Sequence, residues 1–357
     1  MARVFMKGCE AMAEAAVRAG CRFFAGYPIT PQNEIPEYMS RRLPEVGGHF
    51  VQGESEVASV NMVYGAASAG TRAMTSSSSP GIALKSEGIS YCAAARIPIV
   101  YINVARGGPG VGSIQPAQMD YMQATKASGN GGFEMRVFAP STVQEAVDFT
   151  YRAFDLADQD RNPVLILADG VIGTMIEPVV LPEMRSDEEV AAIKAGKRSW
   201  ACIGHSLSEP RAWIQPGNWS TAAMQQCNED AAALYASWQP EWESRWLKDA
   251  DVVITAYGIS ARIAESAAAL LRKEGIKVGL VRPITVHPFP FAAYDEIDYS
   301  KVKAVLDVEM SIPAQFVKDV EAAVHGRCGI ETCLCSGGNI MSREAIMDSV
   351  RRIMEGK

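Results

Sequence analysis

Two glutamates, Glu54 and Glu56, begin a run of small residues over 54–69 that is typical of a helix. Glu56 shares an apolar stripe with residues at helical spacing, whereas Glu54 projects from a different side; the stripe continues through Val60, Val63 and Ala67. A carboxyl group on a buried stripe is either paired or has a raised pKa, which makes Glu56 a candidate proton-transfer group. The alternative is a structural carboxylate whose oxygens are satisfied by its neighbours.

A proline-rich turn, residues 27–31 (YPITP), joins a predicted strand to a predicted helix over 30–42. We expect Thr30 to be the N-cap of that helix and Pro31 its first residue. Local chemistry favours a purely structural turn. A hydroxyl beside free backbone N–H groups would also suit an anionic ligand.

Arg106 follows a predicted buried strand and begins a glycine-rich segment, residues 106–112 (RGGPGVG). The segment matches neither phosphate-loop pattern, so a mobile loop is the simplest interpretation. An arginine at the end of a strand is nevertheless well placed to bind a carboxylate through two hydrogen bonds. A further polar turn, residues 75–81 (TSSSSPG), supplies hydroxyls whose role the sequence leaves open.

Strand and helix patterns alternate over residues 1–175, which predicts parallel β-α-β units with both faces of the sheet covered. Residues 249–357 repeat this alternation in a smaller α/β domain. Residues 176–248 contain all six tryptophans of the chain, so we interpret them as a connector that packs on the domains or on a partner. In such sheets, ligands bind at the carboxyl ends of the strands, where the turns described above lie.

The composition limits the possible classes of protein. The chain has 357 residues, 48% of them hydrophobic and 21% charged, which is enough to form substantial cores. A net charge of −7 argues against nucleic acid as the main partner, and no apolar run is long enough to cross a membrane. We expect a cytoplasmic protein.

The eight cysteines do not predict a metal site or disulfides. The cluster at Cys328, Cys333 and Cys335 does not have the spacing of a zinc or iron–sulfur site. Reduced structural thiols are the expectation, with no metal ligands assigned to this chain.

The four segments taken in order resemble the α-type subunits of thiamine-diphosphate-dependent 2-oxoacid:ferredoxin oxidoreductases. These segments are YPITP, then Glu54-Ser55-Glu56 before a small-residue helix, then TSSSSPG, then Arg106-Gly-Gly-Pro. Residues 251–338 look like the transketolase-C-type domain that follows in such subunits. The opening Met6-Lys7-Gly8 and the segment 112–116 (GSIQP) are most similar to the branched-chain, 2-oxoisovalerate branch. Cys9 departs from the asparagine that is common in the family.

The resemblance implies a fold and a set of roles. The fold is a parallel-sheet, pyrimidine-binding α/β domain followed by a smaller transketolase-C-like α/β domain. Glu56 would hydrogen-bond N1′ of the cofactor's aminopyrimidine, while Thr30 and Arg106 would bind the substrate and act with Glu56 in catalysis. The residues implied to contact the cofactor are Tyr27, Pro28, Ile29, Thr30, Glu56, Ser78 and Ser79. The implied reaction converts a branched-chain 2-oxo acid to its acyl-CoA and carbon dioxide and passes electrons to ferredoxin.

The diphosphate half of such a site is not evident in this sequence. The family binds diphosphate and Mg²⁺ through Gly-Asp-Gly and a later asparagine, whereas Ala168-Asp169-Gly170 lacks the first glycine. We therefore expect a β-type partner with the diphosphate and Mg²⁺ half-site and a [4Fe–4S] cluster. Companion γ-type and ferredoxin-like subunits would handle coenzyme A and electron transfer, and the heteromeric unit would form a dimer.

Two other interpretations stay open. A 2-oxoglutarate:ferredoxin oxidoreductase subunit would need an additional cation for the distal carboxylate, which the sequence does not locate. A non-catalytic α/β scaffold would have no use for a buried Glu56 or for Arg106 at the end of a strand. A nicotinamide dehydrogenase is excluded because no suitable glycine-rich turn follows a strand.

Overall fold

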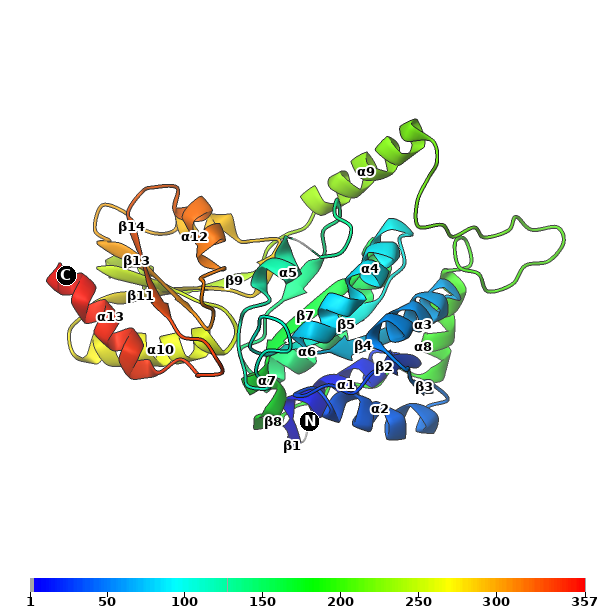
Figure 1. The fold of residues 1–357 in the computed structure, drawn as a ribbon, viewed down its shortest axis with the longest axis horizontal. Helices are drawn as coiled ribbons and strands as arrows, with labels where there is room; N and C mark the ends of the chain where they lie inside the picture. Colours follow the sequence, from blue (N-terminus) through cyan, green and yellow to red (C-terminus); the bar gives the residue numbers. More distant parts are fainter. Residues whose placement is uncertain (1–2, 127, 357) are drawn as a thin grey trace.

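A computed structural model of the chain describes residues 3–126 and 128–356, so the predicted domain ends at residues 1 and 357 lie outside it. The described residues form two open sheets and a two-stranded ribbon, with helices packed around them (Figure 1). The predicted α/β class is confirmed. No helix within the described ranges is long and apolar enough to cross a membrane.

The first sheet has seven strands in the order β12-β6-β7-β5-β4-β2-β3. Six are parallel, and β12 joins antiparallel to β6 at one edge. The strands are β2 (Phe23–Gly26), β3 (His49–Gln52), β4 (Ala73–Ser77), β5 (Val100–Ala105), β6 (Arg136–Phe138), β7 (Val164–Asp169) and β12 (Thr285–His287). All six residues of β5 are buried because both faces of the sheet are covered, which is why this strand is a continuous apolar run.

Helices cover the two faces of the first sheet. The alternate β5 residues Val100, Ile102 and Val104 belong to a core with α1 (Gly8–Arg18), α2 (Glu34–Glu45) and α6 (Val143–Asp160). On the other face, α3 (Glu56–Ser68) packs against α4 (Ser79–Ala94). The short helices α5 (Tyr121–Thr125) and α7 (Gly170–Thr174) follow β5 and β7, and the ribbon pairs β1 (Val4–Lys7) with β8 (Ile176–Val179).

The second sheet has five strands in the order β14-β13-β10-β11-β9, with β9 antiparallel at the edge. Its strands are β9 (Trp242–Arg245), β10 (Val252–Thr255), β11 (Val278–Pro283), β13 (Ala304–Glu309) and β14 (Gly329–Leu334). The helical elements of this part are η1 (Leu247–Asp249), α10 (Gly258–Lys273), α11 (Phe291–Asp295), α12 (Val317–Val324) and α13 (Arg343–Glu355). The second half of the sequence also contributes one strand to the first sheet, because β12 lies at the edge of that sheet.

The segment between the two parts contains α8 (Asp187–Gly196) and α9 (Thr221–Ala236), and neither helix has a buried residue. Figure 1 shows α9 and the loop before it extending away from both sheets. The tryptophans behave differently: Trp238 is buried at 4% exposure, whereas Trp213 and Trp219 are 80% and 105% exposed. Some of this segment therefore packs on the chain itself and some of it presents aromatic side chains to the outside.

Candidate active site

The predicted site segments meet at the carboxyl edge of the first sheet. The turn 27–31 follows β2, and Glu54 and Glu56 follow β3. The polar turn of residues 75–81, called the serine turn below, begins in the last residues of β4, and Arg106 follows β5. Because β2 to β5 are parallel neighbours, their carboxyl ends lie at the same edge. The topology thus brings together all four segments that were selected from the sequence.

Glu56 is the first residue of α3, and the preceding Ser55 caps the helix by accepting a hydrogen bond from the Ala58 N–H at 3.1 Å. Its side chain is 6% exposed, whereas Glu54 is exposed. The predicted directions of the two glutamates are confirmed, because Val60 and Val63 on the same stripe are also buried. Within the described residues, no hydrogen bond reaches either oxygen of Glu56.

Gly81 of α4 makes room for the Glu56 carboxyl group. A Cβ atom built at Gly81 would lie 2.6 Å from Glu56 Oε1 and would also collide with the Ser77 hydroxyl. Glycine is therefore required at this contact, and it leaves Glu56 and Ser77 as neighbours above the start of α4.

The helix predicted to begin at Thr30 begins instead at Glu34, with Asn33 at the N-cap position. The expectation that Thr30 caps this helix is wrong. Pro36 gives the physical reason: in a helix that began at Pro31, it would lie in the interior and remove an internal hydrogen bond. Starting at Glu34 places Pro36 in the first turn, where the N–H has no helical partner anyway. Thr30 is exposed at the edge of the site.

Arg106 is 6% exposed and contacts the turn that contains Thr30. Its Nη1 donates to the Thr30 carbonyl at 2.8 Å, and its Nη2 donates to the Val111 carbonyl at 2.8 Å. Its Nε–H is buried without a partner. The structure therefore places Arg106 beside Thr30 as expected, but the contact uses the main chain of Thr30.

The glycine-rich loop after Arg106 is closed by hydrogen bonds. The Ser113 N–H donates to the Gly107 carbonyl at 2.9 Å, and the Gly107 N–H donates to the Gln115 carbonyl at 3.0 Å. Two residues of this loop and the segment after it are exposed and apolar, Val111 at 80% and Ile114 at 58%.

The serine turn combines satisfied and unsatisfied hydroxyl groups. Ser79 donates to Asp120 Oδ2 at 2.5 Å and accepts from the Arg106 backbone N–H at 2.9 Å. The hydroxyls of Ser77 and Ser78 are buried without a partner. Of the two serines assigned to the cofactor, Ser78 is thus free to bind a ligand, and Ser79 also supports Arg106.

Three further polar residues of this site, Asp120, Asn103 and Lys85, were not predicted from the sequence. Asp120 accepts hydrogen bonds from Ser79 and from the Asn103 amide at 2.7 Å, and burial raises its pKa. Lys85 of α4 is fully buried and donates to the Thr75 hydroxyl at 2.7 Å. Burial lowers the pKa of Lys85 to about 7, while the nearby Glu56 carboxylate opposes that shift. The sequence gives no local signal for Lys85, because a lysine in a helix is usually exposed.

Asp169, the acidic residue of the incomplete Gly-Asp-Gly string, joins the two parts of the chain. Its oxygens accept from the N–H groups of Val171 at 3.0 Å, Ile172 at 3.1 Å and Ile259 at 2.9 Å. Burial raises its pKa to about 6, and these hydrogen bonds oppose the rise. Asp169 therefore caps α7 and reaches the start of α10.

The described residues offer groups that fit the pyrimidine half of thiamine diphosphate. Glu56 is buried with free acceptor oxygens, and the orphaned groups are the Ser77 and Ser78 hydroxyls and the Arg106 Nε–H. Among these residues, no group of three His, Cys, Asp or Glu side chains is arranged to hold a metal ion. The roles assigned from the sequence to Glu56, Thr30, Arg106, Tyr27, Pro28, Ile29, Ser78 and Ser79 stay predictions.

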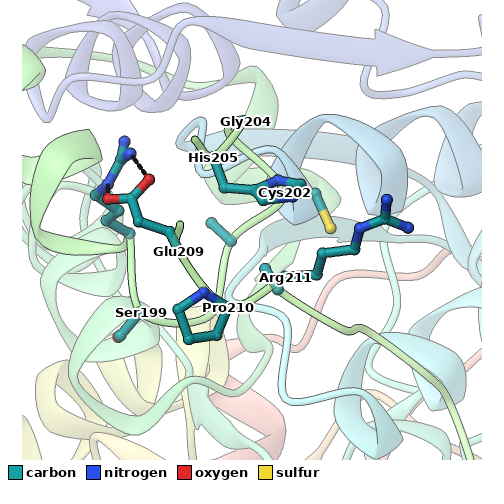
Figure 2. Close-up of a pocket in the computed structure, with 10 residues that line it drawn as sticks. Ser199, Cys202, Gly204, His205, Glu209, Pro210 and Arg211 are labelled. Atoms are coloured by element: carbon teal, nitrogen blue, oxygen red, sulfur yellow. Dashed lines mark hydrogen bonds and ion pairs between the residues drawn. The ribbon is translucent and has the colours of Figure 1, made fainter. Parts of the chain in front are cut away.

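A separate hollow lies in the connector, at the start of its long loop (Figure 2). It has a volume of about 530 Å³ and includes Cys202, His205 and Arg211. Arg198 and Glu209 form an ion pair of 2.6 Å beside it. No predicted site residue lines this hollow, so it is distinct from the carboxyl-edge site.

Comparison with known families divides the chain into two matched regions. Residues 14–235 match the thiamine-diphosphate-binding domain of pyruvate flavodoxin/ferredoxin oxidoreductases. Residues 250–346 match core domain II of pyruvate:ferredoxin oxidoreductase.

Relatives match over nearly the full chain. The chain is 42% identical to the ketoisovalerate oxidoreductase subunit VorB of Methanothermobacter marburgensis, over 99% of this chain and 98% of that subunit. It is 35% identical to the 2-oxoglutarate synthase subunit KorA of Methanocaldococcus jannaschii, over 89% of this chain and 90% of that subunit.

Solved structures share the fold. The 2-oxoglutarate:ferredoxin oxidoreductase from Magnetococcus marinus, with 2-oxoglutarate, coenzyme A and succinyl-CoA bound, matches with a TM-score of 0.82 and 25% identity. That match covers 99% of this chain, which spans 65% of the longer enzyme chain. A split-gene transketolase, described as an inactive beta4 tetramer, matches with a TM-score of 0.60 and 15% identity, a likeness of fold alone.

Proposed function

The chain belongs to the pyruvate flavodoxin/ferredoxin oxidoreductase family, and we propose that it is the α-type subunit of a branched-chain 2-oxoacid:ferredoxin oxidoreductase. The reaction is oxidative decarboxylation of the 2-oxo acid to its acyl-CoA and carbon dioxide, with electrons passed to ferredoxin. The observation that carries the choice of substrate is the 42% identity to a ketoisovalerate oxidoreductase subunit over the full chain.

Thiamine diphosphate, when bound, supplies the activated carbon that attacks the 2-oxo group. Glu56 would hold N1′ of the aminopyrimidine and exchange a proton with it, because the residue is 6% exposed and its oxygens accept no hydrogen bond from the described residues. The Ser78 hydroxyl, also buried and unpartnered, would contact the cofactor beside it. The exposed Tyr27 and Pro28 and the half-buried Ile29 would form the wall of the pyrimidine pocket.

Arg106 would bind the carboxylate of the substrate through its free Nε–H and the remaining N–H groups of its guanidinium. The carbonyls of Thr30 and Val111 fix this guanidinium, so its orientation is set before the substrate arrives. The Thr30 hydroxyl, exposed on the turn whose carbonyl Arg106 contacts, would also bind the substrate. Together with Glu56, these two residues form the proposed catalytic set.

This chain would act only in a heteromeric complex, as its relatives are named as subunits. We propose a β-type partner with the diphosphate and Mg²⁺ half-site and a [4Fe–4S] cluster, together with γ-type and ferredoxin-like subunits. Coenzyme A and ferredoxin are the proposed co-substrates, the unit would form a dimer, and the complex would work in the cytoplasm. Exposed apolar residues beside the site, Val111 and Ile114, support a partner that covers it.

A 2-oxoglutarate enzyme is the second candidate, supported by the structural match to the Magnetococcus enzyme. The test is to purify the chain with its natural partners and to measure reduction of a low-potential dye with coenzyme A. We expect 2-oxoisovalerate to give a higher kcat/KM than 2-oxoglutarate or pyruvate. Preference for 2-oxoglutarate would overturn the branched-chain assignment, and an inactive complex with its cofactors loaded would overturn the enzyme class.

A further inference from the structure

A hollow of about 470 Å³ lies between the end of α4, residues 130–133 and α9, and we call it the α4–α9 hollow (Figure 1). It shares no lining residue with the hollow of Figure 2, and none of its lining residues belongs to the carboxyl-edge site. Its size is that of pockets that hold small organic ligands. The groups that line it therefore indicate which ligand it would accept.

Two arginines line the α4–α9 hollow, and both donate to main-chain carbonyls. Nη2 of Arg96 donates to the Asp160 carbonyl at 2.8 Å, and Nε of Arg161 donates to the Arg96 carbonyl at 3.2 Å. The Nε–H of Arg96 is buried and has no partner among the described residues. No carboxylate oxygen of those residues lies within 4.0 Å of either guanidinium. The two positive charges are therefore not neutralised by an acid of this chain's described part.

The acidic residues near this hollow are engaged elsewhere. Asp230 of α9 lines the hollow, but it is exposed and accepts a hydrogen bond at 2.9 Å from an amide of its own helix. The carboxylate of Asp160 pairs with Arg136 at 2.7 Å. Burial and the neighbouring charge of Arg96 both lower the pKa of Arg161. An anion that entered the hollow would meet two positive charges that lack a counter-ion.

Both arginines occupy a backbone conformation that disfavours long side chains. Arg96, with φ +56°, comes just after α4, and Arg161, with φ +48°, ends α6. Glycine or asparagine is the usual residue in this left-handed region, because a longer side chain crowds the backbone there. Either would make the same turns at a lower cost. The turns alone therefore do not explain the presence of two arginines.

Arg161 has one further contact, and it leaves N–H groups available. The guanidinium carbon of Arg161 lies 4.4 Å from the centre of the Trp200 ring. The ring covers the face of the guanidinium, whereas the N–H donors lie in its plane. Among the described residues, no hydrogen bond uses Nη1 or Nη2 of Arg161. These donors, together with the Nε–H of Arg96, can bind the oxygens of an anion.

The other walls of the hollow are aromatic or open. Tyr91 of α4, Phe133 and Tyr235 of α9 line it, and none of these three is fully buried. A Cβ atom at Gly131 or Gly132 would have no atom within 4 Å, so this loop leaves open space. Aromatic side chains bind flat rings such as nucleotide bases by stacking, and arginines bind phosphate groups in the plane of the guanidinium.

We propose that the α4–α9 hollow is a binding site for a phosphorylated nucleotide, with Arg96 and Arg161 at its phosphate groups and the aromatic side chains against its base. The proposal concerns a site away from the carboxyl edge, and it does not depend on the proposed function.

The test is isothermal titration calorimetry of the purified full chain with ADP, and with adenosine and inorganic phosphate as its two parts. We expect one ADP per chain, bound more tightly than either part because ADP uses both kinds of wall. No saturable binding of ADP would overturn the proposal. Competition by coenzyme A, which carries the same adenosine and phosphate groups, would identify coenzyme A as the source of the ligand. Without competition, the source is a free nucleotide.

Two variants remove the charges without disturbing the turns. Arg96→Asn and Arg161→Asn each place in the left-handed position a residue that favours it, so the melting temperature should stay close to that of the wild type. Each should raise the Kd for ADP by about 10-fold, the scale of a lost hydrogen bond to a charged group. An unchanged Kd in both variants would overturn the assignment of the arginines.

Arg211→Asn is the matched control, because Arg211 is an exposed arginine of the connector that does not line this hollow. The Kd for ADP should stay at the wild-type value in this variant. An equal rise would mean that ADP binds to general surface charge, and the site would be refuted. If the wild-type chain does not bind ADP and the two hollow variants fail to assemble with partner subunits, the arginines contact a partner instead, which also overturns the proposal.

Discussion

Two buried carboxylates at the carboxyl edge of the first sheet, Glu56 at the start of α3 and Asp169 at the end of β7, have opposite surroundings. Asp169 accepts hydrogen bonds from three backbone N–H groups and connects the first sheet to α10. Glu56 is almost as buried, yet its oxygens have no hydrogen-bond partner within the described residues. Burial alone therefore does not distinguish a structural acid from one that we propose to be catalytic.

A third carboxylate, Glu309 in the second sheet, follows the pattern of Asp169. It is fully buried and accepts from the N–H groups of Gln315, Phe316 and Val317, at distances of 2.9 to 3.3 Å, just before and at the start of α12. These carboxylates differ in whether their oxygens accept hydrogen bonds from backbone N–H groups. Of these three, the carboxylates that accept hydrogen bonds hold elements together, and Glu56 is available to a ligand. Asp307 of β13 is also buried without a hydrogen-bond partner, so the position of Glu56 at the carboxyl edge of the first sheet is part of the distinction.

The largest expected effect is on stability, in Asp169→Ala. Three backbone N–H groups would lose their acceptor, so the free energy of unfolding should fall by about 3 kcal/mol. Chemical denaturation of the chain measures this, with Glu54→Ala as an exposed control that should change it by less than about 0.5 kcal/mol. Equal values for the two variants would mean that filled acceptor sites do not identify a structural acid.

A smaller effect is expected in Arg106→Lys. Lysine keeps the charge but cannot bond the Thr30 and Val111 carbonyls while presenting a planar group to a carboxylate. Turnover of the complex should fall by about 10-fold for every 2-oxo acid, a loss of roughly 1.4 kcal/mol. Arg211→Lys, in the exposed connector, is the control. A selective loss with 2-oxoglutarate would place Arg106 at the distal end of the pocket.

The smallest effect on stability is expected in Thr30→Val. Because Thr30 does not cap α2 and contacts Arg106 through its carbonyl, the melting temperature should stay near that of the wild type. Turnover should still fall if the hydroxyl binds substrate. A clear drop in melting temperature, measured by calorimetry, would restore a capping role for this residue.

Local sequence patterns predicted the parts of the site that depend on one helix or one strand. The spacing of Glu56 with Val60 was enough to predict which glutamate is buried, because a helix fixes side-chain direction. The start of α2 differs from the prediction because Pro36 limits where the helix can begin, and this restriction outweighs the capping pattern at Thr30. The correct prediction for Glu56 and the wrong one for the start of α2 both depend on local backbone rules.

The remaining features depend on contacts between distant segments. A lysine in a helix is usually exposed, so the burial of Lys85 follows only from the close approach of α3 to α4. Asp120 carries no motif, and its partners Ser79 and Asn103 come from other elements. The place of β12 in the first sheet also does not follow from local patterns, since it pairs Thr285 with Phe138 and His287 with Val137, which are far apart in the sequence.

The most direct test of proton transfer by Glu56, the carboxylate without a hydrogen-bond partner, is to measure the turnover of Glu56→Gln and Glu54→Gln in the assembled complex. Glutamine keeps the size of glutamate but cannot exchange a proton, so Glu56→Gln should lower kcat by roughly 10²-fold or more. Glu54→Gln should stay close to the wild type because its side chain is exposed. Equal activities, or a larger loss in Glu54→Gln, would contradict the assignment of proton transfer to Glu56.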